Sequence, residues 1–116
     1  MGVITMVEMT ETQLIGTGGL AAQALEAVAE LRTALSELEV SGDVRSRAGW
    51  MLDDMVDELS RPDPDRDVMA SRLWRLTEFL RRSGVDVGSG TPVFGPIAGI
   101  AAWVGPLGEA LLTRLG

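Results

Sequence analysis

The chain has 116 residues, a length that fits one compact domain with room for a hydrophobic core. Its 17 acidic side chains outnumber its 10 basic ones, and a formal net charge of −7 would repel the phosphate backbone of a nucleic acid. All the basic residues are arginine, and the sequence contains no lysine, histidine, cysteine or tyrosine. It therefore lacks a side chain that titrates near neutrality, a thiolate or amine nucleophile, and the ligands of ordinary zinc sites. We expect a non-enzymatic protein with no cofactor, no metal, no nucleic-acid partner and no small-molecule substrate.

The N-terminal sequence MGVITMVEMTETQ lacks the basic first region of a secretory signal and carries Glu8 early in its apolar run. It begins with Met-Gly, but Met6 occupies the position where an N-myristoylation motif has serine or threonine. We therefore expect a cytoplasmic protein. Residues 1–16 fit a short strand, a helix extension or a tail equally well, and this segment is left unassigned.

Residues 17–83 predict a core of three helices. After Thr17, apolar residues recur at three- and four-residue steps, which is typical of an amphipathic helix. The sequence SGD at 41–43 supplies a turn and an N-cap for a second helix, whose outer face is expected to be acidic and exposed. The two apolar faces consist of Leu20, Ala24, Ala27, Val28, Leu31, Leu35 and Leu38, and of Val44, Ala48, Met51, Leu52, Met55 and Leu59; the acidic face consists of Asp53, Asp54, Asp57 and Glu58.

The sequence RPDPDRD separates the second helix from the third, because each proline disfavours a helical residue before it. Asp65 or Asp67 can cap the third helix. Its apolar face consists of Met69, Leu73, Leu76 and Leu80, and Arg72, Arg75 and Arg82 lie away from that face. An acidic second helix followed by a basic third one predicts an antiparallel helical hairpin. Gly84 is expected to end the third helix and to begin a glycine- and serine-rich linker over residues 84–91.

The C-terminal segment, residues 92–116, is predicted as an apolar helix rich in glycine and alanine. The chain is uncharged from Val87 to Gly108, which is long enough to cross a bilayer, but glycines and prolines interrupt this stretch. A helix that begins at Pro96, with a kink at Gly105 and Pro106, fits a core helix better than a membrane span. Its expected inner face consists of Ile97, Ile100, Ala101, Val104, Gly108, Leu111 and Leu115.

An alternative for the same segment is a close-packing surface. Gly95 and Gly99 form a GxxxG pair, and small residues at this spacing allow helices of different copies to approach closely, in a membrane or in water. Residues 92–116 are accordingly the candidate for membrane association.

The three tryptophans, Trp50, Trp74 and Trp103, all lie about 100° or more away from the apolar stripes of their helices, at 100° of rotation per residue. Large amphipathic aromatics outside a core are enriched at protein interfaces and at membrane boundaries. The alternative is that the domain buries each of these helices on two sides. The candidate interaction residues are therefore Trp50, Trp74, Trp103, Gly95 and Gly99.

Four features of the chain follow one another in a distinctive order: a first helix rich in Leu, Ala and Glu, the acidic RAGWMLDDMVDEL, the basic RLWRLTEFLRRSG, and an apolar end rich in Gly and Ala. This layout resembles that of uncharacterised small helical proteins of actinobacteria. Some of these are encoded beside NTPase, protease or caspase-like genes in bacterial conflict and antiphage systems. The resemblance implies an interaction or effector role, and it assigns no functional residue.

The sequence thus predicts an all-α bundle of three to four helices that associates with itself or with a protein partner. The alternative is a membrane-active effector whose C-terminal segment is released on activation.

Overall fold

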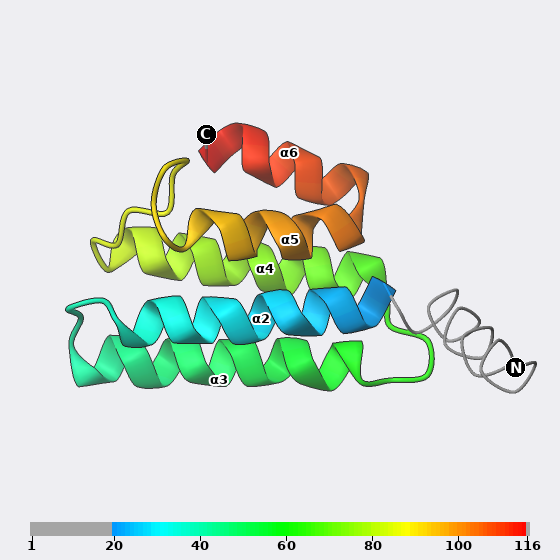
Figure 1. Cartoon of the computed structure of the whole chain (residues 1–116), viewed down its shortest axis with the longest axis horizontal. Helices are drawn as coiled ribbons and strands as arrows, with labels where there is room; N and C mark the ends of the chain where they lie inside the picture. Colours follow the sequence, from blue (N-terminus) through cyan, green and yellow to red (C-terminus); the bar gives the residue numbers. More distant parts are fainter. Residues whose placement is uncertain (1–19, 116) are drawn as a thin grey trace, which may run out of the picture.

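The computed structural model describes residues 20–115, and every regular element in this range is a helix. The helices are α2 (Leu20–Ser36), α3 (Gly42–Leu59), α4 (Arg66–Arg82), α5 (Phe94–Val104) and α6 (Pro106–Leu115) (Figure 1). The predicted all-α fold class is confirmed for this range. The unassigned residues 1–16 lie outside it.

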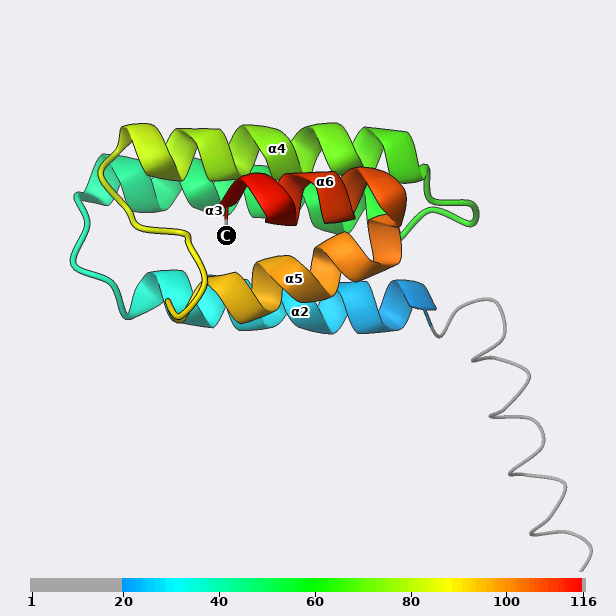
Figure 2. The same cartoon turned by 90° about the horizontal axis from the view of Figure 1, so that it is seen from above.

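Four of the helices surround a common interior. Consecutive helices run antiparallel, and α5 returns alongside α2, so that α2 and α4 each contact both α3 and α5 (Figure 1). Seen from above, α3 and α4 lie on one side and α2 and α5 on the other (Figure 2). The last helix, α6, lies over α4 and α5 and contacts both of them.

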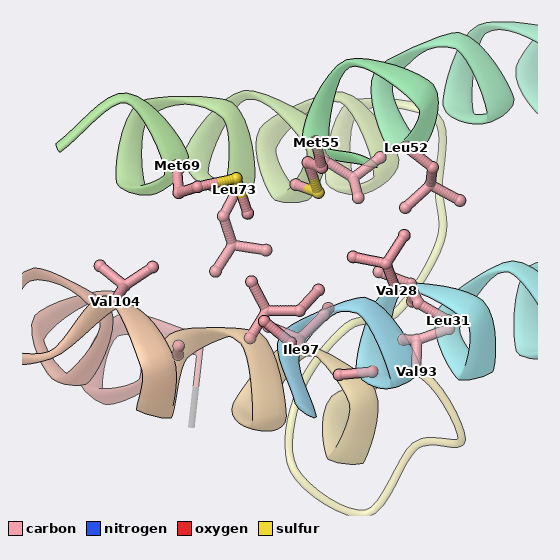
Figure 3. Packing of buried hydrophobic residues seen from close by; sticks show 14 of the residues in the cluster. Val28, Leu31, Leu52, Met55, Met69, Leu73, Val93, Ile97 and Val104 are labelled. Carbon is pink, nitrogen blue, oxygen red and sulfur yellow. The ribbon is translucent and has the colours of Figure 1, made fainter. Parts of the chain in front are cut away.

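The interior is filled by the apolar faces that periodicity predicts for the first three helices, together with one face of α5. Figure 3 shows side chains of α3 and α4 pointing toward those of α2 and α5 across the core. The largest fully buried apolar side chains are Leu31, Leu52, Met55, Met69, Leu73, Leu76, Leu80, Ile97 and Ile100. Three residues of the predicted faces, Leu38, Val44 and Met51, are only partly buried, and the side chain of Leu20 lies outside the described part of the chain.

The helix ends follow the predicted capping residues. Ser41 caps α3, and its hydroxyl accepts a hydrogen bond from the backbone N–H three residues later at 3.2 Å. Asp65 caps α4, and its carboxylate accepts from the N–H groups two and three residues later at 2.8 and 3.2 Å. Gly84 has a φ of 87° after the end of α4, and the N–H groups of Gly84 and Val85 donate to carbonyls in the last turn at 3.0 and 2.9 Å. These bonds satisfy groups that a helix end would otherwise leave unpaired.

The segment predicted as a linker, residues 84–91, contributes to the core as well as connecting α4 to α5. Val87 is buried in the same apolar cluster as the helix faces. On either side of it the chain forms local turns, in which Gly88 N donates to the Asp86 carboxylate at 3.0 Å and the Thr91 hydroxyl donates to the Gly88 carbonyl at 2.7 Å. The connection is therefore anchored to the helices that it joins.

The segment predicted as one helix over residues 92–116 consists of two helices. α5 ends at Gly105, whose φ of 97° lies in the region that favours glycine, and Pro106 begins α6 at a position where a missing N–H costs little. The chain turns back there, and α6 packs against α5 through Gly108, where a Cβ atom would collide with the Ala101 carbonyl. Among residues 20–115, no helix combines the length and the apolarity that a membrane span needs.

Glu58 was predicted on the exposed acidic face of α3, but its side chain is only 2 % exposed. The connection between α3 and α4 folds over it, and the carboxylate accepts a hydrogen bond from the Asp65 backbone N–H at 2.8 Å. Arg61 and Arg72 lie 3.3 and 4.0 Å from the same carboxylate. The Asp65 hydrogen bond, with help from the two guanidinium groups and against the effect of burial, lowers the pKa of Glu58. The charged form of Glu58 therefore holds this connection in place.

A lowered pKa in the folded state predicts a pH-dependent contribution to stability. The contribution is complete above the ordinary glutamate pKa of about 4.3 and disappears as the pH falls through the lower pKa of the folded protein. We expect Glu58→Gln to be less stable than the wild type at neutral pH and to approach it in acid. Urea unfolding of both proteins across this pH range measures the difference, with the exposed Glu30→Gln as the control. A difference that stayed constant or grew in acid would contradict the assignment.

Candidate functional site

Trp103 was predicted on an outer face, and the structure buries it instead. Its side chain is 8 % exposed, because α5 is covered on a second side by the start of α4. The Arg66 guanidinium lies over the indole at 4.8 Å from the ring centroid, and Arg66 Nε donates to the Trp103 carbonyl at 2.9 Å. Trp103 therefore joins α4 to the end of α5, and its ring is not free for a partner.

Trp74 holds α6 in the same way. Its side chain is partly buried on α4, and the Arg114 guanidinium of α6 lies 4.7 Å from its ring centroid. A cation over an aromatic face is attracted by the ring quadrupole, by about 0.5–1 kcal/mol at an exposed site. This pair adds a contact between α4 and α6.

Trp50 differs from the other two tryptophans. It lies on the outer face of α3 and is 67 % exposed. Within residues 20–115, the other large apolar side chain that is mostly exposed is Leu107 of α6, at 54 %. α3 and α6 lie on opposite sides of the molecule (Figure 1), so these two side chains belong to separate surfaces. Of the three candidate tryptophans, Trp50 alone is presented to solvent over most of its surface.

The two candidate glycines have different surroundings. A Cβ atom built on Gly99 would lie 3.0 Å from the Cβ atom of Ala27, so Gly99 allows α5 to approach α2 closely within one chain. A Cβ atom on Gly95 would meet nothing within 4 Å. Gly99 thus serves close packing inside the chain, whereas the space beside Gly95 is open.

A cleft of about 210 Å³ opens between α3 and α4, and its lining includes Met51, the residue after Trp50. It is lined by Met51 and Asp54 of α3 and by Arg72 and Arg75 of α4. Arg72 is held in place, because it donates to the Asp54 backbone carbonyl and lies near the buried Glu58 carboxylate. Arg75 is exposed, and no ion pair is formed by it among the described residues. The cleft therefore combines a thioether and two guanidinium groups with the Asp54 carboxylate. The guanidinium group of Arg75 is the one that suits an aromatic or acidic group of a partner.

A larger hollow of about 480 Å³ lies at the end of the molecule where the α2–α3 and α4–α5 connections meet. Its lining is mainly small and apolar loop residues, and its charged members are Glu39 and Asp86. Two separate carboxylates in an open hollow do not form a catalytic pair, so we take the surface around Trp50 as the candidate site.

Sequence periodicity identified Trp50 but missed the cleft beside it. The sequence shows only that Arg72 and Arg75 lie away from the apolar face of their helix, and it does not show that they line a cleft against α3. Which side of α4 borders α3 depends on how the helices pack, and this is not contained in the spacing of one helix. The surface combines an exposed indole with an arginine-lined cleft, and this combination appears only in the folded chain.

The different surroundings of Trp50 and Trp103 predict opposite effects on stability. Trp103→Ser removes a buried indole and should lower the free energy of unfolding by about 3–5 kcal/mol, enough to prevent folding of a marginal domain. Trp50→Ser replaces an exposed side chain and should change it by about 0.5 kcal/mol or less. Denaturant unfolding followed by far-ultraviolet circular dichroism measures both. Equal losses for the two variants would place Trp50 in the core and contradict the assignment.

Comparison of the chain with protein-family models, with curated proteins and with solved structures finds no match.

Proposed function

We propose that this chain is a small helical bundle, built from α2 to α5 and closed by α6, that acts by non-enzymatic association with another protein chain. The contact surface in this proposal is the outer face of α3 around Trp50. The single observation that carries it is the 67 % exposure of Trp50, while each of the other two tryptophans is covered by an arginine of another helix.

An exposed indole with no role in the fold has a large capacity for association. An aromatic side chain covers about 150–250 Å² when buried, and apolar burial contributes about 25 cal/mol per Å². One tryptophan can therefore contribute a few kcal/mol to an interface, and tryptophan is among the residues most enriched at binding hot spots. The fold gains nothing comparable from holding this ring in water.

The charges around Trp50 favour a protein over a nucleic acid. Asp53, Asp54 and Asp57 are exposed on α3, one or two turns from the indole, and Asp53 is paired with Arg32 of α2 at 2.7 Å. Carboxylates at these positions repel phosphate groups, whereas they pair with basic side chains of a protein. The resemblance to small actinobacterial helical proteins adds the expectation that such a partner belongs to a bacterial conflict system.

The alternative of a membrane-active effector has weaker support from the same contacts. It requires the segment over residues 92–116 to leave the helical core. Ile97, Ile100 and Val104 of this segment are buried against the other helices, and α5 makes its most extensive contact with α2. Release of α5 would therefore open the core itself. Release of α6 alone would expose only a short helix of 10 residues.

The proposal is tested by site-specific photo-crosslinking in living cells. A photoreactive residue at Ser46, which is exposed on α3 one turn before Trp50, should form a discrete adduct with a protein chain. The adduct should disappear in the Trp50→Ser variant, because the indole supplies most of the contact energy. The same residue at Thr113, exposed on α6, serves as the control. A Ser46 probe that gave no adduct, or an adduct that persisted without Trp50, would contradict the proposal.

A further inference from the structure

Trp103 and Trp74 are packed against the rest of the chain in the same way. Each is covered by the guanidinium of an arginine from a different helix, Arg66 over Trp103 at 4.8 Å and Arg114 over Trp74 at 4.7 Å. Trp50 has no such cover among residues 20–115. Residues 1–19 and Gly116 contain no arginine, so an arginine from outside the described part of the chain would have to come from another molecule.

Arg75, on the helix that packs against α3, forms no ion pair among the described residues. The cleft between α3 and α4 begins at Met51, the residue after Trp50, and extends to Arg75 on the neighbouring helix. Arg72 cannot turn freely toward a ligand, because the Asp54 carbonyl and the Glu58 carboxylate hold it. Arg75 has neither restraint among the described residues, so its guanidinium is available to lie over an aromatic ring.

The two halves of a contact thus lie side by side on one face of one chain. A two-fold dimer repeats the same patch on both copies, so the patch has to carry both a projecting group and a group that receives it. Trp50 is the projecting group, and the cleft with Met51 and Arg75 is the receiving one. A partner of a different kind would need only one of them.

The charges around the two halves are complementary. Asp57 is exposed two turns after Trp50 and forms no ion pair among the described residues. The receiving cleft is lined by two arginines and one carboxylate, Asp54. When Trp50 of one copy enters the cleft of the other, Asp57 can approach the exposed Arg75 of that copy. Opposite charges at the rim of an interface favour this register over one that brings like charges together.

We propose that the partner is a second copy of this chain, and that the two copies form a two-fold dimer in which Trp50 of each lies in the Met51, Arg72 and Arg75 cleft of the other. The inference rests on the proposed function and names the partner. The dimer contains two equal contacts, one in each direction, and this symmetry provides its test.

The experiment measures the dimer dissociation constant of the full chain by sedimentation velocity over a concentration series. Trp50→Ser removes the projecting group, and Arg75→Glu places a negative charge where the ring would lie. Each variant alone loses both contacts of its homodimer and should dissociate at least about tenfold more readily than the wild type. Arg82→Glu makes the same charge change on α4 outside the cleft, and Leu107→Ser removes the other exposed apolar side chain; both should match the wild type.

The decisive sample is an equal mixture of Trp50→Ser and Arg75→Glu. Trp50 of the Arg75→Glu copy can still enter the intact cleft of the Trp50→Ser copy, so a mixed dimer keeps one contact. The mixture should therefore associate more strongly than either variant alone. A mixture no tighter than its components would overturn the proposal, because the two residues would then not contact each other across the interface.

Other results separate the failure of this inference from the failure of the proposed function. A chain that stays monomeric at all concentrations, while the Ser46 probe links it to a different protein, would overturn the dimer and leave the proposed function standing. A chain that is monomeric and forms no adduct would overturn both. A dilute monomer whose Trp50 is already protected from a collisional quencher, compared with Trp50→Ser, would show that the chain itself covers this surface and would also overturn the dimer.

Discussion

The structure depends on the burial of one helix, α5, that has no charged side chain. α5 spans Phe94–Val104, and it can be stable in water only if other elements cover most of its surface. α2 covers one side and presents small residues there, so that Ala27 lies directly beside Gly99. α4 covers a second side. Without α5, the sides of α2 and α4 that α3 does not cover would be open to water.

The remaining features of the C-terminal part close the structure around α5. Gly105 and Pro106 end the helix and reverse the chain, and α6 then lies against α5 where Gly108 allows close contact. Trp103 and Trp74 are used in this closure, each under an arginine of a neighbouring helix. The same packing that covers α5 therefore explains why Trp103 and Trp74 are covered. Trp50 remains exposed on α3, which contacts neither α5 nor α6.

The helices and their ends could be predicted because they depend on local chemistry. Leu73 and Leu76 lie in the core as their spacing predicts, and Ser41 and Asp65 cap the helices that follow them. The spacing of residues in α3 also places Trp50 on an outer face, and its side chain is exposed there. These features follow from the angular position of each residue around the axis of its own helix, and from the need of the first turn for hydrogen-bond acceptors.

The remaining features depend on contacts between elements, which the spacing within one helix does not contain. Trp103 lies away from the main apolar stripe of α5 but is buried, because α5 is covered on more than one side. Glu58 belongs by periodicity to an exposed acidic face, but the α3–α4 connection folds over it. Gly105 was recognised as a place for a kink, and the reversal that places α6 over α5 requires the tertiary contacts of Gly108.

Native-state amide hydrogen exchange tests most directly whether α5 is an integral part of the core. Amides that are hydrogen-bonded in a core helix exchange only when the whole domain unfolds, whereas peripheral elements exchange through smaller openings. We expect the amides of Ile100 and Ala101 in α5 to show the same exchange free energy as those of Val28 and Leu31 in α2, and the amides of α6 to show a lower one. If the α5 amides exchanged together with those of α6, at a free energy below that of α2, then residues 94–115 would form a detachable unit and the account would be contradicted.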